Sequence, residues 1–264
     1  MKTKYLSFLL LGSVLVAGCG QKAVEVTSTA STEIPASSTP VNNVSAAVID
    51  PASAGTIKGK VLFEGTVPPA QEISVRGNPE CAVFHQGGKV KSEELVVNNG
   101  ALQNVFVYVK EGLEGKSFPA PSEAVTIQNK SCVYVPHVSG AQVGQSIILL
   151  NEDPTLHNIH SYSKNSKSWN LGLPFQGMKQ TKKFEAAEVM VHLKCDVHPW
   201  MSGYVGVLSH PYFSVSGADG SFEIKNLPPG EYLIEAWQEK LGVQSQKIKI
   251  EPQETKELEF KFTA

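Results

Sequence analysis

Apolar and polar residues alternate in many short segments of this chain, and this period of two constrains the fold more than any other feature. The pattern recurs at residues 57–61, 105–109, 189–195, 222–224 and 258–262. Because successive side chains of a strand point to opposite faces of a sheet, such alternation is typical of half-buried strands. Turn signals such as Asn98-Asn99-Gly100 separate the segments, and no window of a dozen residues has a convincing helical period. The sequence therefore predicts an all-β protein, built as a sandwich or a barrel.

The composition agrees with this prediction and excludes two classes of protein. The 264 residues include 22 Gly and 16 Pro, a turn-rich content that suits many short strands. Hydrophobic residues make up 41% and charged residues 18%, which supplies enough apolar material for a core and excludes a wholly disordered chain. The formal net charge is −2 and basic residues do not cluster, so nucleic acid is not an expected partner.

Residues 1–18 are predicted to be a signal peptide. Lys2 and Lys4 precede an apolar run at residues 5–17, which is short for a membrane span but matches the hydrophobic part of an export signal. The run ends in the sequence LVAGC, which resembles the lipobox of bacterial lipoproteins. The resemblance implies that Cys19 is lipidated and that the protein is exported and anchored to a membrane. Gly20, in place of Asp, favours the outer membrane, with the protein facing the periplasm.

Residues 19–54 are expected to form a flexible tether behind this anchor. They are rich in Ser, Thr, Ala and Val, contain three prolines and show no hydrophobic periodicity. About 35 flexible residues have a root-mean-square reach of roughly 30 Å. The folded part of the protein would therefore search a volume close to the membrane.

The chain contains four cysteines: Cys19, Cys81, Cys132 and Cys195. If the first carries lipid, three remain in an oxidising compartment, and an odd number leaves one thiol to be explained. We interpret Cys81 and Cys132 as a structural disulfide. The alternative is a second metal site, because His85 and His137 lie four and five residues downstream of these two cysteines. Cys195 has different neighbours, described below.

The folded part divides by its sequence patterns into segments 55–122, 123–210 and 211–264. The last segment contains a DG turn, a strand, an LPPG turn and another strand between Asp219 and Tyr232. This stretch resembles the transthyretin-like regulatory modules found beside carboxypeptidases, which implies an Ig-like β sandwich. Those modules usually open with a strand like residues 55–61, which lies at the other end of this chain. Segment 55–122 therefore either joins the C-terminal segment in one sandwich or forms a module of its own.

The strongest chemical signal is a short segment that carries a thiol, an imidazole and a thioether. Cys195, His198 and Met201 are spaced i, i+3 and i+6 between two predicted strands, and His157 follows an apolar strand at residues 147–150. Two His, one Cys and one Met are the ligand set of a blue-copper site. The thiolate suits Cu(I), the imidazoles suit both oxidation states, and a weak axial thioether helps to tune the potential.

Residues 123–210 resemble a cupredoxin, and the C-x2-H-x2-M and H-N-x-H motifs resemble those of the amicyanins. The resemblance implies a Greek-key β sandwich that holds one type 1 copper ion. Carried over to this chain, it makes His157, Cys195 and His198 the equatorial ligands and Met201 the axial ligand.

The same resemblance implies roles for three further residues. Asn158 would form hydrogen bonds that orient and tune the ligands. The ring edge of His198 would reach the surface through an apolar patch and serve for electron exchange, with Pro199 and Trp200 as the candidate patch residues.

The chemical alternative is a tetrahedral zinc site formed by His157, His160, Cys195 and His198. It would leave Met201 without a role, and His160 is expected instead to pack or to point to solvent. His192 and His210 have no partner in the sequence pattern and are interpreted as structural.

No paired carboxylates, G-x-S-x-G motif or phosphate loop stands out, and four protein ligands leave a metal no open position for substrate, so an enzyme is not expected. The sequence predicts a membrane-anchored blue copper protein that transfers single electrons, with an unidentified redox protein as its partner. Two alternatives stay open. One is a copper-binding protein for buffering or delivery, and the other is a structural or adhesive β-sandwich lipoprotein.

Overall fold

The computed structural model describes residue 50 and residues 52–264, which belong to one compact unit. The expected signal peptide, Cys19 and most of the tether lie outside the described residues. The described part is almost entirely β, which confirms the predicted fold class. Its helices are α1 (Pro79–Ala82) and the 3-10 turn η1 (Gln86–Gly88). Among the residues described, no helix combines the length and the apolar character needed to cross a bilayer.

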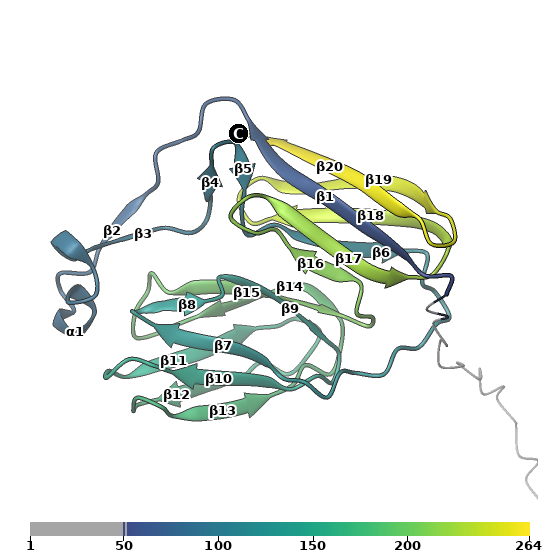
Figure 1. Cartoon of the computed structure of the whole chain (residues 1–264). Coiled ribbons are helices and arrows are strands. Elements are labelled where there is room, and N and C mark those ends of the chain that lie inside the picture. The colour runs from purple at the N-terminus through teal and green to yellow at the C-terminus, as the bar shows by residue number, and fades with distance from the viewer. Residues whose placement is uncertain (1–49, 51) are drawn as a thin grey trace, which may run out of the picture. The chain divides into compact units, whose positions relative to one another are not determined.

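The first of two β sandwiches is built from both ends of the folded chain (Figure 1). One of its sheets comprises β1 (Gly55–Glu64), β4 (Val97–Asn98), β5 (Ala101–Leu102), β17 (Ser221–Leu227) and β20 (Thr255–Thr263). The other comprises β6 (Phe106–Glu111), β16 (Phe213–Val215), β18 (Gly230–Gln238) and β19 (Gly242–Ile250). β1 pairs in parallel with β20 and antiparallel with β17. Strands from opposite ends of the folded chain are thus hydrogen-bonded neighbours.

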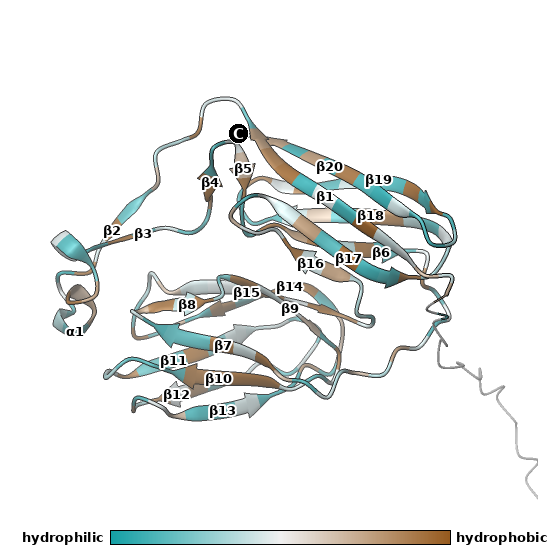
Figure 2. Cartoon of the chain, viewed as in Figure 1, coloured by the Kyte–Doolittle hydropathy of each residue, from teal (hydrophilic) through white to brown (hydrophobic). Residues whose placement is uncertain are grey.

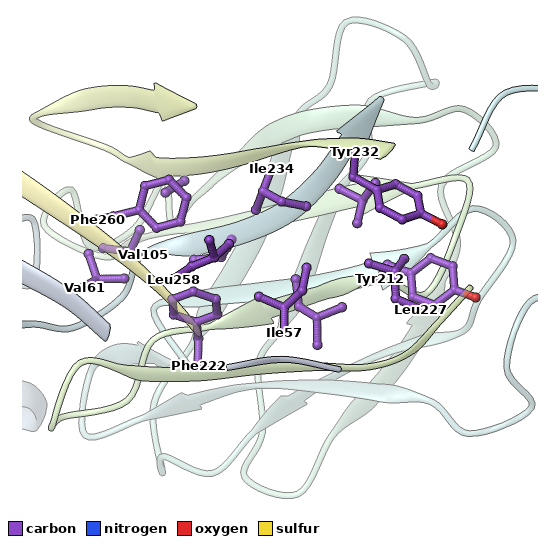
Figure 3. Close-up of a cluster of buried hydrophobic side chains, with 14 of the residues drawn as sticks. Ile57, Val61, Val105, Tyr212, Phe222, Leu227, Tyr232, Ile234, Leu258 and Phe260 are labelled. Carbon is purple, nitrogen blue, oxygen red and sulfur yellow. The ribbon is translucent and has the colours of Figure 1, made fainter. Parts of the chain in front are cut away.

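The core of this sandwich follows from the alternation in the sequence. On β20, Leu258, Phe260 and Phe262 are buried, whereas the residues between them are exposed. Figure 2 shows the resulting alternation of apolar and polar positions along β1 and β20. Figure 3 shows the buried side chains of the two sheets meeting, among them Ile57 of β1 and Ile234 of β18. Burial of these side chains stabilises the sandwich by roughly 1.5–3 kcal/mol each.

The second sandwich is formed by residues from the middle of the chain. One sheet contains β7 (Val125–Lys130), β8 (Val133–Val135), β10 (Ile147–Asn151) and β13 (Lys179–Lys182). The other contains β9 (Val138–Gln142), β11 (His157–Tyr162), β12 (Asn170–Leu173), β14 (Glu188–Lys194) and β15 (Ser202–Leu208). β7 pairs in parallel with β10, and β9 pairs in parallel with β15. A buried cluster that includes Ile127, Leu149, Ile159 and Val191 fills the space between the sheets.

A disulfide joins the segment around α1 to this second sandwich. Cys81 of α1 is bonded to Cys132, with a Cα–Cα distance of 5.6 Å, as the cysteine count predicts. The short strands β2 (Glu72–Ser74) and β3 (Lys89–Lys91) pair with each other on either side of α1 in the sequence. The alternative metal site at these cysteines is excluded, because both sulfurs are in the bond and His85 Nε2 lies 2.8 Å from the carbonyl oxygen of Ser131.

Candidate metal centre

Three of the predicted ligands converge at one end of the second sandwich. His157 is the first residue of β11, Cys195 follows the last residue of β14, and His198 lies in the loop between β14 and β15. Their donor atoms all lie within 4.8 Å of one another, and all three side chains are buried. In the sequence, Cys195 lies 38 residues after His157 and His198 lies 41 residues after it. The antiparallel pairing of β11 with β14 brings the three residues together.

Backbone hydrogen bonds close the loop that carries Cys195, His198 and Met201. The N–H of Cys195 donates to the carbonyl of Met201 at 3.2 Å, and the N–H of Met201 donates to the carbonyl of His198 at 2.9 Å. The N–H of His198 donates to the Cys195 sulfur at 3.4 Å. A loop held at both ends and in its middle keeps its donor atoms nearly fixed, which limits the rearrangement that accompanies a change of charge at the centre.

The two imidazole rings face each other through their Nδ1 atoms. His157 Nδ1 lies 3.0 Å from His198 Nδ1, and the latter lies 3.8 Å from the Cys195 sulfur. On the far side of its ring, His157 Nε2 lies 2.9 Å from Asp153 Oδ2. A carboxylate accepts a hydrogen bond from a protonated nitrogen, so Asp153 favours the tautomer with the proton on Nε2 and the Nδ1 lone pair directed to the centre.

Asp153 was not identified from the sequence, although it bonds directly to a predicted ligand. Besides His157, it accepts hydrogen bonds from the backbone N–H groups of Ser131 at 2.6 Å and of Cys132 at 2.8 Å. Burial acts to raise the pKa of this carboxyl, but the bonds from His157, Cys132 and Ser131 outweigh it and lower the pKa. The only sequence signal was a carboxylate four residues before His157. Asp153 thereby connects the candidate centre to the disulfide-bonded turn.

Asn158 lies against Cys195, where the resemblance to cupredoxins placed it. Its Oδ1 is 3.2 Å from the Cys195 sulfur and accepts the N–H of Asp196 at 2.7 Å. Its Nδ2 donates to Asn170 at 2.6 Å. Asn158 therefore links β11 to the start of the 195–201 loop.

The pKa directions at the three donors reflect their burial and their mutual contacts. Burial acts to raise the pKa of the Cys195 thiol, but hydrogen bonds from His157 and from the backbone outweigh it, so the pKa lies below that of an ordinary cysteine. Burial acts to lower the pKa of His157, but its bonds to Asp153 and Cys195 raise it above the usual value. Burial and the neighbouring His157 lower the pKa of His198. A thiolate at Cys195 and a neutral ring at His198 are the states that a metal ion requires.

Met201 is buried in the same apolar cluster as Cys195, with 1% of its surface exposed.

The two residues expected to form the apolar patch for electron exchange differ in their exposure. Pro199 is exposed, but Trp200 is half-buried, and its indole N–H donates to the carbonyl of Cys132 at 3.0 Å. His198 is only 3% exposed.

Two exposed apolar residues close to the donors were not identified from the sequence. Leu156 and Val197 directly precede His157 and His198, with 44% and 42% of their surfaces exposed. Together with Pro199 they place apolar surface on both of the segments that carry the imidazoles.

The other histidines of the second sandwich and its flanks do not belong to the candidate centre. His160 Nδ1 lies 3.1 Å from Asp196 Oδ2, and its ring stacks on Tyr162. His192 lies 2.8 Å from the hydroxyl of Ser202. His210 Nδ1 accepts the N–H of Tyr212 at 3.3 Å. A second group of close donor atoms includes Cys132, whose sulfur is already in the disulfide.

Comparisons with known proteins found similarity in solved structures alone. No protein-family model and no curated protein matches the chain. A purple cupredoxin from Nitrosopumilus maritimus is 27% identical, with a TM-score of 0.27, over 31% of this chain and 98% of that chain. An amicyanin variant in its oxidised state, with a proline replaced by alanine, is 22% identical, with a TM-score of 0.29, over 32% of this chain and 81% of that chain.

A copper-containing nitrite reductase from Thermus scotoductus is 20% identical, with a TM-score of 0.31, over 39% of this chain and 25% of the reductase chain. The similar structures thus include an enzyme, of which this chain matches only a quarter.

Proposed function

We propose that this protein binds one copper ion and transfers single electrons. In this proposal His157, Cys195, His198 and Met201 would hold the copper ion. The observation that carries the proposal is the convergence of two imidazoles and one thiol, whose donor atoms lie within 4.8 Å of one another and are all buried. One soft thiolate with two imidazoles is a donor set suited to both oxidation states of copper.

The contacts of His160 favour copper over zinc. In the tetrahedral zinc alternative His160 would be the fourth ligand, but its Nδ1 lies 3.1 Å from Asp196 and its ring stacks on Tyr162. Met201, in contrast, is buried in the same cluster as Cys195 and ends the same loop. When bound, copper would supply a one-electron couple at the centre.

The surrounding residues support electron transfer rather than substrate turnover. Three hydrogen bonds from backbone N–H groups close the 195–201 loop. Asn158 contacts the sulfur of Cys195, and Asp153 accepts a hydrogen bond from the ring of His157. A centre with four protein ligands leaves no position for a substrate. We place the electron-exchange surface at the exposed apolar residues Leu156, Val197 and Pro199, where an unidentified redox protein would dock.

The visible and electron paramagnetic resonance spectra of the copper-loaded full chain test this proposal. An intense thiolate-to-copper band is expected, giving a blue, green or purple protein, and Cys195→Ser abolishes the band because a hydroxyl cannot replace the soft thiolate. Met201→Leu keeps the colour and raises the reduction potential, since an axial donor that stabilises Cu(II) is lost. His160→Ala is the matched control and leaves the spectrum unchanged.

Zinc binding predicts different results. The metal-loaded protein would be colourless, and His160→Ala would lower its metal content more than Met201→Leu. Either of these outcomes contradicts the proposal.

We further propose that Cys19 is a lipidated membrane anchor and that the protein is exported to the periplasmic face of the outer membrane. The support for this is the sequence LVAGC after a short apolar run. Metabolic labelling with a radioactive fatty acid should label the wild type and not Cys19→Ser. Continued labelling of the variant would show that the anchor lies elsewhere.

A further inference from the structure

The turn between β7 and β8 lies directly behind the candidate metal centre. Its two residues, Ser131 and Cys132, have positive φ angles of 54° and 56°. A two-residue hairpin turn of this kind usually contains Asn and Gly, because few other residues adopt positive φ readily. Here other bonds hold the turn in place. Cys132 is bonded to Cys81, and the N–H groups of both turn residues donate to the carboxylate of Asp153.

One carboxylate oxygen joins this turn to the predicted ligand His157. Asp153 Oδ2 accepts the N–H of Cys132 at 2.8 Å and lies 2.9 Å from His157 Nε2. The Cys132 sulfur, a carboxylate oxygen of Asp153 and a ring nitrogen of His157 all lie within 4.8 Å of one another. The Nδ1 of the same ring faces His198. His157 therefore lies between the other donors of the centre and the disulfide-bonded turn.

The same turn is also bonded to the neighbour of the second imidazole. The carbonyl of Cys132 accepts the indole N–H of Trp200 at 3.0 Å. The ring of Trp200 lies beside that of His198, with the ring centroids 5.1 Å apart. Cys132 is completely buried. Its N–H thus acts toward one histidine and its carbonyl toward the other, while its side chain is fixed by the disulfide.

We propose that the Cys81–Cys132 disulfide positions the two histidine ligands of the metal centre, in addition to stabilising the fold. The proposal rests on the copper function proposed above. Cys132 is the positioning residue, because the bond to Cys81 fixes its backbone. The N–H of this backbone holds Asp153 against His157, and the carbonyl holds Trp200 beside His198. Without the disulfide, the turn and both of its partners gain freedom to move.

The negative charge of Asp153 determines the direction of the effect on copper. A carboxylate beside a ligand stabilises Cu(II) more than Cu(I), because the interaction increases with the charge of the ion. When Asp153 is no longer held against His157, the affinity for Cu(II) falls more than the affinity for Cu(I), and the reduction potential rises. A tenfold loss of Cu(II) affinity relative to Cu(I) raises the potential of a one-electron couple by about 59 mV.

Copper binding and redox titration of the full chain test this proposal. Cys81→Ala/Cys132→Ala should lower the Cu(II) affinity by roughly tenfold or more, the usual effect of losing groups that hold a ligand, and should raise the reduction potential. Asp153→Asn should shift both quantities in the same direction with the disulfide intact. Gly206→Ala is the control for a loss of stability alone. The Cβ atom it adds meets the ring of Phe106, so the potential should stay at the wild-type value.

Trp200→Phe tests the connection to His198 separately. It removes the N–H that donates to Cys132 but keeps an aromatic ring beside His198, and it should change the copper hyperfine splitting in the electron paramagnetic resonance spectrum. Trp169→Phe is the matched control, because the buried indole N–H of Trp169 has no acceptor in the described part of the chain. This control should leave the splitting unchanged.

A measurement without copper separates this proposal from the choice of metal. In a proton–nitrogen correlation spectrum of the metal-free chain, the Nε2 proton of His157 should give a signal protected from solvent exchange. Cys81→Ala/Cys132→Ala and Asp153→Asn should both lose this protection. If these losses occur but the copper-loaded wild type has no thiolate band, the copper function is wrong and the positioning of His157 stands.

The proposal is wrong if the double cysteine variant matches wild type in Cu(II) affinity, in reduction potential and in the protection of the His157 proton. If that variant does not fold, Asp153→Asn and Trp200→Phe decide the question, since each breaks one connection and leaves the disulfide in place. Wild-type values in both of these variants would equally overturn the proposal.

Discussion

At the scale of single residues, Asp153 shows how a side chain absent from the predicted ligand set supports that set. Its carboxylate is bound by His157 and by two backbone N–H groups, those of Ser131 and Cys132. Removal of the carboxylate leaves three donors without an acceptor, two of them buried and the N–H of Ser131 partly buried. Each unpaired buried group costs about 1–3 kcal/mol.

Asp153→Ala should therefore lower the free energy of unfolding of the metal-free chain by about 3 kcal/mol or more. Urea denaturation followed by circular dichroism measures this change. Glu72→Ala is the control, since the ion pair of Glu72 with Lys89 is exposed and should contribute little to stability. A cost as small as that of the control would show that the three hydrogen bonds add little to stability.

His210 is a second residue whose burial has a measurable consequence. Its surface is 7% exposed, and burial lowers its pKa to about 4 from the usual value of 6.5. Between these two pH values the unfolded chain binds a proton at this residue and the folded chain does not. Stability contributed by the neutral ring is therefore present above pH 6.5 and is lost as the pH falls toward 4.

His210→Gln should reduce this acid sensitivity and keep an acceptor for the N–H of Tyr212. The free energy of unfolding of the wild type should fall between neutral pH and pH 4 by up to about 3 kcal/mol more than that of the variant. Denaturation of both proteins at a series of pH values gives the two slopes. Equal slopes would mean that His210 takes up its proton over the same pH range in the folded and the unfolded chain.

At the scale of strands, two facing glycines provide room for aromatic rings. Gly206 of β15 pairs with Gly140 of β9, and a Cβ atom at Gly206 would lie 2.3 Å from the ring of Phe106. A Cβ atom at Gly140 would lie 2.2 Å from the ring of Phe213. The absence of side chains at this point lets the rings of β6 and β16 pack directly on the backbone.

Gly206→Ala should accordingly destabilise the protein by about 1–3 kcal/mol, the usual cost of overpacking. Gly172→Ala in β12 is the matched control, because a Cβ atom there meets nothing within 4 Å. Thermal unfolding of the two variants beside wild type makes the comparison. If both variants unfold at the wild-type temperature, the contact with Phe106 is looser than its geometry indicates.

At the scale of the whole molecule, the disulfide restricts a long stretch of chain. Cys81 and Cys132 are separated by 51 residues, and in the chain-entropy description a loop of that length stabilises the folded state by about 4 kcal/mol. The closed loop contains β3 to β7, which include strands of both sandwiches. The bond therefore acts on the folding of more than the segment around α1.

The double variant Cys81→Ala/Cys132→Ala should lose about 4 kcal/mol of unfolding free energy in guanidinium denaturation. Reduction of the wild type before denaturation is the control and should reproduce most of this loss. A double variant within about 1 kcal/mol of wild type would mean that the unfolded chain is already compact around this loop.

Sequence by itself determined the features that depend on local order. The period of two identifies the strands at residues 57–61 and 258–262 and shows which side chains they bury, because alternation is a property of each strand alone. Cys195, His198 and Met201 fall on one loop because they lie within seven consecutive residues between two strands. The Cys81–Cys132 pairing followed from counting the thiols that had no other use.

Tertiary structure decided which segments meet. The alternation in β1 shows which of its faces is buried but not that its neighbours are β17 and β20, and so the sequence left open whether the two ends of the folded chain share a sandwich. The contact of His137 with Glu239 spans 102 residues. Such contacts join residues that are far apart in the sequence and depend on how the sheets pack against each other. They cannot be predicted from the residues that neighbour each partner in the chain. Local order thus indicated the candidate ligands, and non-local strand pairing brought His157 to Cys195 and His198.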